Sequence, residues 1–316
     1  MEPSTSNRLG SYCYFFADTV KSLLTSCSPT ETLIINNKKY KVIKCLGEGG
    51  FSYVYLVIEP TTNARFALKR IKVQLPEHEE RLISEVKNHS KVDSKYVLKL
   101  VDSMLLKDNF NQKIIEGFLI LPFYKNGTCQ NLIENLGDGE YLPIGKILEL
   151  TLDIIKGLET FHENNLAFRD LKPANVLLTD EGQGVLMDLG SVADFYCKIN
   201  SRKEASALAE LCAETCTAPF RAPELFDPTS SGVITGVSDI WSLGCTIFAL
   251  AYRNSPYDGS ATAAIGGRIS YPTERDIYGT KFREYVESIL VTDPSSRPSA
   301  SQVRRTTEMY LNSLNS

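Results

Sequence analysis

The pattern of apolar residues changes once along this 316-residue chain, and that change constrains the fold more than any other feature. From Tyr40 to Ile71, β-branched and aromatic runs are joined by Gly and Asn/Thr turns, which predicts a meander of three antiparallel strands. From Pro143 onward, apolar residues recur at three- and four-residue spacing, as between Ile147 and Phe161, which predicts long helices. A β-rich first third and a helix-rich remainder predict a two-lobed α+β protein.

Further elements follow from local patterns. A helix is predicted from Pro76, with Leu82, Val86 and His89 on one face. Other runs predict two strands and two more helices: Tyr96–Leu106, Ile114–Leu121, Val237–Tyr252 and Phe282–Leu290.

Composition excludes several classes of protein. Apolar residues make up 43% of the chain and charged residues 23%, which is typical of a globular domain. The net charge of −4 argues against a nucleic-acid partner. The eight cysteines form no C-x-x-C pair, so we expect a reduced, cytoplasmic protein without a disulfide scaffold. No run reaches the roughly 18 apolar residues of a membrane span, and the N-terminus does not read as a signal peptide.

A glycine cluster follows the first predicted strand. Its residues are Gly47, Glu48, Gly49, Gly50, Phe51, Ser52, Tyr53 and Val54. Because the cluster lies between two strands, it predicts a hairpin whose backbone could close over phosphates. An ordinary glycine turn is the alternative. Lys69 ends a later apolar strand, and Glu85 on the next helix could pair with it; solvated side chains are the alternative here too.

The segment from Phe168 to Gly190 carries the clearest chemistry. Phosphoryl transfer requires a carboxylate that orients the attacking hydroxyl, a cation near the phosphate and oxygen ligands for Mg²⁺. Asp170, Lys172, Asn175 and Asp188 supply these groups in this order. Asn175 and Asp188 bracket a predicted short β-hairpin. Each charge alone would usually be a solvated loop residue, but the full set in this order is improbable by chance.

With these motifs, the chain resembles the eukaryotic protein kinases from about residue 38 to residue 310. The resemblance implies the bilobal kinase fold, with a leader at 1–31, a small lobe and hinge at 38–124 and a large lobe at 125–312. It also implies ATP and Mg²⁺ as cofactors and protein Ser/Thr hydroxyls as acceptors. The Lys172-Pro173-Ala174-Asn175 sequence is similar to that of serine/threonine kinases.

The resemblance also assigns roles to residues. Asp170 would be the catalytic base and Lys172 the γ-phosphate contact, while Asn175 and Asp188 would bind Mg²⁺. The implied ATP-binding residues are Leu46, Gly47, Glu48, Gly49, Gly50, Phe51, Ser52, Tyr53, Val54, Lys69, Glu85, Pro122 and Tyr124. Ala222-Pro223-Glu224 looks like the end of an activation segment, and Arg297 would form a buried pair with Glu224.

More specifically, the segments around Gly47, Asp188 and Cys216 look like those of the Numb-associated kinase group. Within it, the chain is most similar to the small lipid-modified kinases and their fungal vacuolar-membrane relatives. That branch has a helical insertion in the activation segment, and the composition of Arg202–Cys216 predicts such a helix. Activation-segment hydroxyls are candidate phosphorylation sites, with Arg169 able to bind a phosphate: Ser191, Ser201, Ser206, Thr215 and Thr217.

Three positions depart from the kinase pattern. Ser52 replaces the third loop glycine and Leu189 replaces the usual Phe after the metal-binding Asp. Phe168 replaces the usual catalytic-loop histidine, which keeps the packing but loses a hydrogen bond worth about 1 kcal/mol. We therefore expect an active enzyme with reduced or differently regulated activity. The alternative is a pseudokinase scaffold, which would require loss of a catalytic residue that this chain retains.

The leader has an apolar stripe at helical spacing, formed by Leu9, Tyr12, Phe16, Val20, Leu23 and Cys27. It predicts a membrane-interface helix with S-acylation at Cys13 or Cys27. N-myristoylation is excluded because it requires glycine after Met1, and Glu2 stands there. The expected location is cytoplasmic, peripheral on Golgi, vacuolar or endosomal membranes, with a role in trafficking or organelle regulation. A helix docked on the protein core and a disordered tail are the alternatives.

Overall fold

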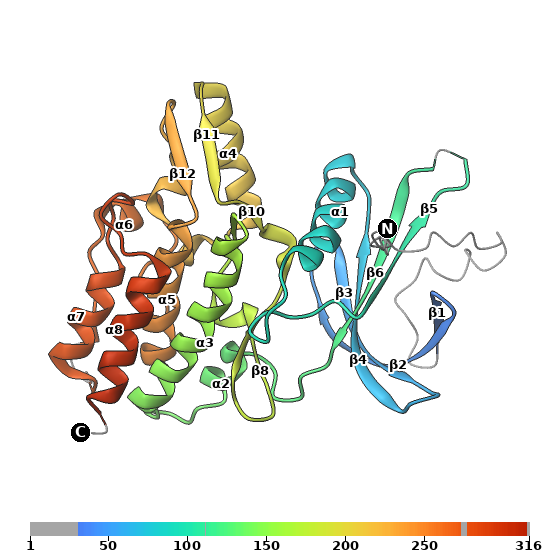
Figure 1. Cartoon of the computed structure of the whole chain (residues 1–316), viewed down its shortest axis with the longest axis horizontal. Helices are drawn as coiled ribbons and strands as arrows, with labels where there is room; N and C mark the ends of the chain where they lie inside the picture. The colour runs from blue at the N-terminus through green and yellow to red at the C-terminus, as the bar shows by residue number, and fades with distance from the viewer. Residues whose placement is uncertain (1–30, 111, 273–276, 315–316) are drawn as a thin grey trace, which may run out of the picture. The chain divides into compact units, whose positions relative to one another are not determined.

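The chain folds into two compact units (Figure 1). The computed structural model describes residues 31–110, 112–272 and 277–314. The first unit runs to Ser90 and resumes over Lys99–Phe123, and the second contains Lys91–Leu98 and everything from Tyr124 onward. The leader, with Cys13 and Cys27, therefore lies outside the described residues.

The first unit is an antiparallel six-stranded sheet in the order β1-β2-β3-β4-β6-β5, with one helix. Its elements are β1 (Thr32–Ile35), β2 (Lys38–Glu48), β3 (Ser52–Glu59), β4 (Ala64–Lys72), α1 (Pro76–Lys91), β5 (Asp102–Lys107) and β6 (Ile114–Pro122). Strands β2, β3 and β4 confirm the predicted meander, and their inward-facing residues, such as Val57 and Leu68, are fully buried.

Two strand predictions need correction. Strand β1 was not predicted; it pairs with β2 through a turn at Asn36 and Asn37, whose φ angles of 45° and 67° suit asparagine. The strand predicted from Tyr96 begins only at Asp102. The first of the preceding residues belong to the second unit, where Val97 forms a bridge with Leu186.

Helix α1 begins at Pro76 as predicted, but its buried face is rotated slightly from the predicted one. Leu82 is buried, whereas Val86 and His89 are only half-buried, and Glu85 lies on the buried face instead. Gly117 in β6 permits this packing, because a Cβ atom there would lie 2.5 Å from the Leu82 side chain. The helix can thus press closely against the sheet.

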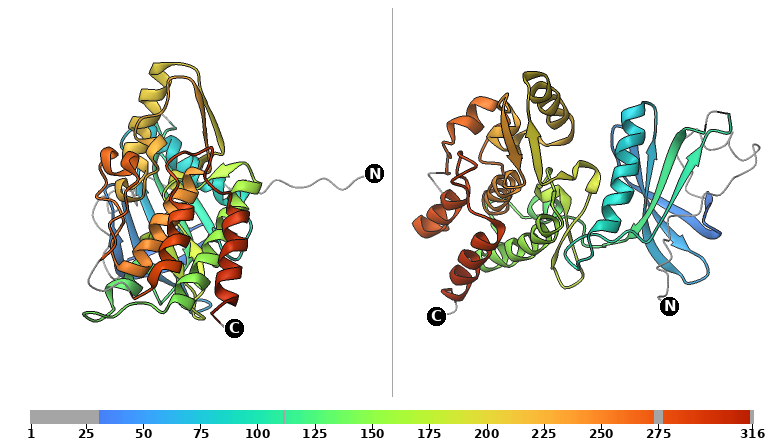
Figure 2. Two further views of the ribbon diagram at one scale, coloured as in Figure 1. Left: turned by 90° about the vertical axis from the view of Figure 1, so that its left-hand side faces the viewer. Right: turned by 45° about the horizontal axis from the view of Figure 1, so that its top comes forward.

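The second unit is mainly helical and has its own apolar core (Figure 2). Its helices are α2 (Cys129–Glu134), α3 (Ile144–Glu163), α4 (Arg202–Thr215), α5 (Ser238–Tyr252), α6 (Ala261–Gly266), α7 (Gly279–Ile289) and α8 (Ala300–Asn312). Every residue of α5 is buried, including the polar residues Asp239 and Ser242. Helix α3 packs against α5 and α8, and its predicted apolar residues are all fully buried.

Short strands and 3-10 turns connect these helices. The two-stranded pairs are β7 (Leu166–Ala167) with β10 (Ala193–Asp194), β8 (Val176–Leu178) with β9 (Gly184–Leu186), and β11 (Tyr196–Ile199) with β12 (Gly232–Thr235). The 3-10 turns are η2 (Pro173–Asn175), η3 (Leu189–Ser191), η4 (Ala218–Phe220) and η5 (Pro223–Leu225). Helix α4 confirms the helix predicted over this segment and lies beside β11 (Figure 1). Among the described residues, no helix has the length and apolar character needed to cross a bilayer.

Candidate active site

Asp170 is the centre of a hydrogen-bonded cluster in the second unit. Its Oδ2 atom lies 2.7 Å from Lys172 Nζ and 2.9 Å from Asn175 Nδ2. Its Oδ1 atom accepts a hydrogen bond of 2.8 Å from the backbone N–H of Thr217. Lys172 also donates to the Thr217 hydroxyl. These donors orient a carboxylate that is buried except for a small fraction of its surface, as a positioned proton acceptor requires.

A second carboxylate, on Asp239 of α5, holds the backbone just before Asp170. Its two oxygens accept hydrogen bonds of 2.8 Å from the backbone N–H groups of Phe168 and Arg169. His162 Nε2 lies 3.0 Å from the same side chain. Arg169 has a φ of 73°, in the left-handed region, so this turn needs such support. The sequence predicted a helix over Val237–Tyr252 but not that Asp239 would bind the backbone before Asp170, because the contact joins residues 70 positions apart.

Asn175 and Asp188 lie at the two ends of the β8–β9 hairpin, as predicted. Asn175 ends η2, and its carbonyl accepts a 2.9 Å hydrogen bond from the N–H of Met187, next to Asp188. The amide N–H₂ of Asn175 donates to the backbone carbonyl and the carboxylate of Asp170, which leaves its oxygen as the ligand atom. Asp188 has a left-handed φ of 66°.

This donor set fits Mg²⁺. Amide and carboxylate oxygens are the ligands that Mg²⁺ prefers, and the ion is commonly held by one or two carboxylates together with substrate phosphates. Within the described ranges, no cluster of three or more His, Cys, Asp or Glu side chains could form an all-protein metal cage. Asn175 and Asp188 would supply two such oxygens, and phosphate oxygens and water would complete the coordination.

The glycine cluster of the first unit forms the β2–β3 hairpin. Gly47 pairs with Val54 and Glu48 with Tyr53, so only Gly49, Gly50 and Phe51 lie in the turn. The N–H of Gly49 donates to the carbonyl of Ser52 at 2.7 Å. A Cβ atom at Gly50 would meet nothing within 4 Å, and Leu46 and Phe51 are exposed. A hydrogen bond with Glu48 raises the pKa of Tyr53.

Lys69 and Glu85 lie together in the first unit, with Lys69 Nζ 2.7 Å from Glu85 Oε1. Glu85 is buried on α1, and Lys69 on β4 is mostly buried, so this is not a solvated surface pair. Pro122 ends β6 opposite Phe66. Tyr124 is the first residue of the longer segment of the second unit, and partial burial raises its pKa.

The sequence model of the protein kinase domain matches residues 40–307. The chain belongs to the protein kinase family. It is 39% identical to Serine/threonine-protein kinase 16 of Mus musculus over 274 residues, which cover 84% of this chain and 88% of that protein. It is 30% identical to Serine/threonine-protein kinase ppk13 of Schizosaccharomyces pombe, covering 93% and 97% of the two chains. Serine/threonine-protein kinase ENV7 of Saccharomyces cerevisiae is 27% identical, with 86% and 92% covered.

These relatives confirm that the chain is a serine/threonine protein kinase, and the β-rich and helical units have the character of the two kinase lobes. They give no support to the scaffold alternative. Protein kinases in general use ATP and Mg²⁺. The kinase retains every residue type that this reaction needs.

Phe168 of the kinase is fully buried and packs on Phe161 of α3, with ring centroids 5.3 Å apart. Leu189, which follows Asp188, is fully buried in the same core. Both departures from the family pattern therefore keep an apolar contact. The core of this region is therefore filled although Phe168 and Leu189 replace the usual histidine and phenylalanine.

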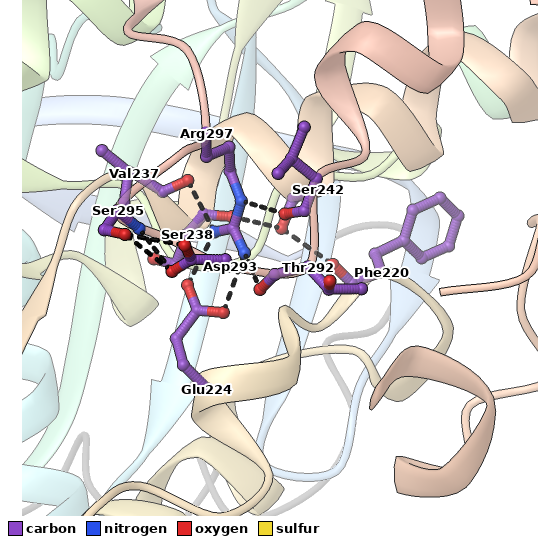
Figure 3. A network of polar contacts seen from close by, with 10 residues as sticks. Phe220, Glu224, Val237, Ser238, Ser242, Thr292, Asp293, Ser295 and Arg297 are labelled. Carbon is purple, nitrogen blue, oxygen red and sulfur yellow. Dashed lines mark hydrogen bonds and ion pairs between the residues drawn. The ribbon is translucent and has the colours of Figure 1, made fainter. Parts of the chain in front are cut away.

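The activation segment of the kinase is anchored to α5 by a polar network (Figure 3). Arg297 donates to both carboxylate oxygens of Glu224, at 2.7 and 3.0 Å, which confirms the predicted pair. It also donates to the carbonyls of Val237, Val291 and Thr292. The Ser242 hydroxyl donates to the carbonyl of Phe220. The end of the segment is thus tied to the buried core.

Several candidate phosphorylation sites of the kinase already have hydrogen bonds. Ser201 caps α4 by accepting from the N–H of Glu204, and Ser191 donates to the carbonyl of Thr215 at 2.7 Å. The Thr217 hydroxyl accepts from Lys172. Modification of any of these would therefore break a contact within the segment.

Proposed function

We propose that this kinase transfers the γ-phosphate of ATP to Ser or Thr hydroxyls of other proteins, with Asp170 accepting the hydroxyl proton. The observation that carries this proposal is the fixed carboxylate of Asp170, held by Lys172, Asn175 and the backbone of Thr217. A proton acceptor contributes most when its orientation is set before the substrate arrives.

The other residues would act by positioning and by charge. In the first unit, the Leu46–Val54 hairpin covers the nucleotide phosphates and Lys69, oriented by Glu85, binds the α- and β-phosphates. Pro122 and Tyr124, which flank the boundary of the first unit in the sequence, are the further nucleotide-binding residues that the kinase resemblance implies. In the second unit, Lys172 would neutralise the γ-phosphate, while Asn175 and Asp188 would hold Mg²⁺. When bound, the ion would offset the negative charge on the phosphate oxygens.

The test compares Asp170→Asn with Asp180→Asn, an exposed carboxylate that pairs with Lys125 on the surface of the same unit. Purified full-length variants are incubated with Mg²⁺, labelled ATP and a generic protein substrate. Asp170→Asn should lower kcat by about 10²–10⁴-fold with nucleotide binding retained, since it removes a general base. Asp180→Asn should match wild type. Equal kcat in both variants would refute the role of Asp170.

We further propose that the kinase belongs to the lipid-modified branch of the Numb-associated group and acts at the cytosolic face of Golgi, vacuolar or endosomal membranes in trafficking or organelle regulation. The support is the apolar stripe of the leader with Cys13 and Cys27. One acyl chain alone binds membranes marginally, so the stripe would supply the second signal. The partner is then a lipid surface reached through an acylated leader.

The membrane proposal is tested by cell fractionation and by acyl-exchange mass spectrometry. The double variant Cys13→Ser/Cys27→Ser should move to the soluble fraction, whereas Cys45→Ser, at an exposed cysteine of β2, should not. If the double variant stays membrane-bound and neither cysteine is acylated in wild type, the proposal is wrong.

A further inference from the structure

The last turn of α4 carries two thiols that point into the protein. Most of α4 is exposed, and its buried residues are Ala205 and Cys212. Cys216, which ends the helix, is buried as well. The backbone N–H of Cys216 donates to the carbonyl of Cys212 at 3.0 Å, which places the two side chains one helical turn apart on the same face. The two sulfur atoms are therefore neighbours in the activation segment.

Two buried arginines lie next to this thiol pair. Nε and Nη1 of Arg169 and Nε of Arg221 have no hydrogen-bond partner among the described residues. Arg221 Nη2 donates to the carbonyl of Cys216 at 2.7 Å. A guanidinium remains charged at every accessible pH, and a buried charge is costly without an opposite charge nearby.

The charged groups around the pair leave the thiols as the candidates for that opposite charge. From the elements packed on α4, β11 contributes Cys197 and the cation of Lys198, and η5 contributes Glu224, which already pairs with Arg297. On α4 itself, Glu210 and Glu214 are exposed.

The surroundings separate the acidities of the two thiols. The hydrogen bond from Cys216, together with the charges of Arg169 and Arg221, lowers the pKa of Cys212 to about 7. The same hydrogen bond and burial raise the pKa of Cys216. Cys212 is thus the more acidic of the two thiols, and Cys216 keeps its proton as the donor.

We propose that Cys212 and Cys216 form a redox modification site, which hydrogen peroxide converts to a disulfide and which thereby lowers the activity of the kinase. In the first step the Cys212 thiolate attacks peroxide, the O–O bond breaks, and hydroxide leaves and takes up a proton. In the second step the Cys216 sulfur attacks the sulfenic acid of Cys212, the S–O bond breaks and water leaves. Two thiols are oxidised and one peroxide is reduced to two waters.

The bond requires the two Cβ atoms to approach each other by about 1–2 Å. Residues four apart on a helix have Cβ atoms about 5–6 Å apart, whereas a disulfide needs roughly 3.5–4.5 Å. Cys216 has φ −113° and ψ 130°, so it has already left the helical conformation and can move closer without breaking a helical turn. Local opening of this surface helix would admit a molecule as small as peroxide.

Oxidation would affect activity through Arg169. The disulfide removes the thiolate charge beside a residue that directly precedes Asp170. It also shifts the end of α4, where the Thr215 carbonyl accepts from Ser191, three residues after Asp188. This step rests on the proposed role of Asp170, whereas formation of the disulfide does not.

The experiment treats the full chain with hydrogen peroxide and follows both chemistry and activity. Trypsin cuts after Lys203 and Arg221, so one peptide carries Cys212 and Cys216, while Cys197 lies on another that ends at Lys198. Wild type should show loss of two hydrogens within the first peptide. Its kcat should fall about tenfold, as expected when one charge-assisted interaction is lost, and recover with dithiothreitol. Cys216→Ser should stop at a dimedone-reactive sulfenic acid on Cys212, and Cys212→Ser should form neither product.

Cys197→Ser is the matched control and should respond to peroxide like wild type. The proposal is overturned if no such disulfide forms while other cysteines oxidise, or if it forms without loss of kcat. If the preparation is inactive before oxidation, the mass spectrum still shows whether the disulfide forms. The inactivity would then count against the proposed catalytic role of Asp170 and not against the disulfide. If Cys212→Ser does not fold, iodoacetamide labelling of wild type replaces it: half-maximal labelling of Cys212 near pH 7 supports the proposal, and near the usual value of 9 contradicts it.

Discussion

Asp239 is completely buried and carries no catalytic atom, yet its carboxylate accepts hydrogen bonds from two consecutive backbone N–H groups and lies next to His162. Those backbone groups belong to Phe168 and Arg169, directly before Asp170. The position of the proposed base thus depends on a residue of another element. At the residue scale, the site is a set of side chains held by other side chains.

Replacing Asp239 with Asn should therefore weaken both stability and catalysis. The amide has one acceptor oxygen, so one backbone N–H loses its partner, which costs about 1–3 kcal/mol for a buried group. We expect a lower urea midpoint and a lower kcat with the KM for ATP nearly unchanged. Asp180→Asn, at an exposed site, should change neither. An unchanged kcat in Asp239→Asn would exclude this positioning role.

Phe168→His tests whether the departure from the family pattern limits activity. Phe168 is fully buried and packs on Phe161, so histidine costs some packing but can restore a hydrogen bond worth about 1 kcal/mol. If that bond improves the active geometry, kcat rises about fivefold. Steady-state phosphotransfer at saturating ATP measures it. A kcat equal to that of wild type would show that Phe168 does not limit the reaction.

At the scale of elements, the sequence predicted most structures with strong local signals. The meander, α3, α5 and the α4 insertion all have dense apolar periodicity or helix-forming composition. It missed β1, whose two buried residues, Leu33 and Ile35, are too few for a periodicity signal. It also extended β5 back to Tyr96, because residues that belong to the second unit have strand-like composition. The contacts of Asp239 could not be predicted from local sequence patterns because they join segments that are distant in the sequence.

Helix α4 depends on its N-terminal cap, and this can be tested alone. The Ser201 hydroxyl accepts from the N–H of Glu204 at 3.2 Å. Ser201→Ala should destabilise the helix by about 1 kcal/mol. Hydrogen exchange should then speed up in the first turns of α4 and remain unchanged in α3. Ser206→Ala, within the same helix, is the control and should not accelerate exchange. Equal exchange in all three proteins would show that the cap contributes nothing.

At the scale of the whole molecule, the two units have separate cores, and the second is fixed by a buried ion pair between segments 73 residues apart. Arg297 is completely buried at its side chain and binds Glu224 and three backbone carbonyls. Its guanidinium also lies 5.5 Å from the ring of Trp241. Trp241 is the single tryptophan of the chain, so its fluorescence reports the second unit alone.

Arg297→Gln should consequently make the second unit unfold at a lower urea concentration than in wild type. Removing one partner of a buried ion pair costs about 3–5 kcal/mol, because Glu224 keeps its charge without a counter-charge. Arg304→Gln is the matched control: Arg304 pairs with Glu159 at 3.3 Å in the same unit but is 40% exposed, and such pairs contribute less than about 1 kcal/mol. Urea titration followed by tryptophan emission should show a large shift of the midpoint for the first variant only. Similar shifts in both variants would mean that the Glu224–Arg297 pair stabilises this unit no more than a surface contact does.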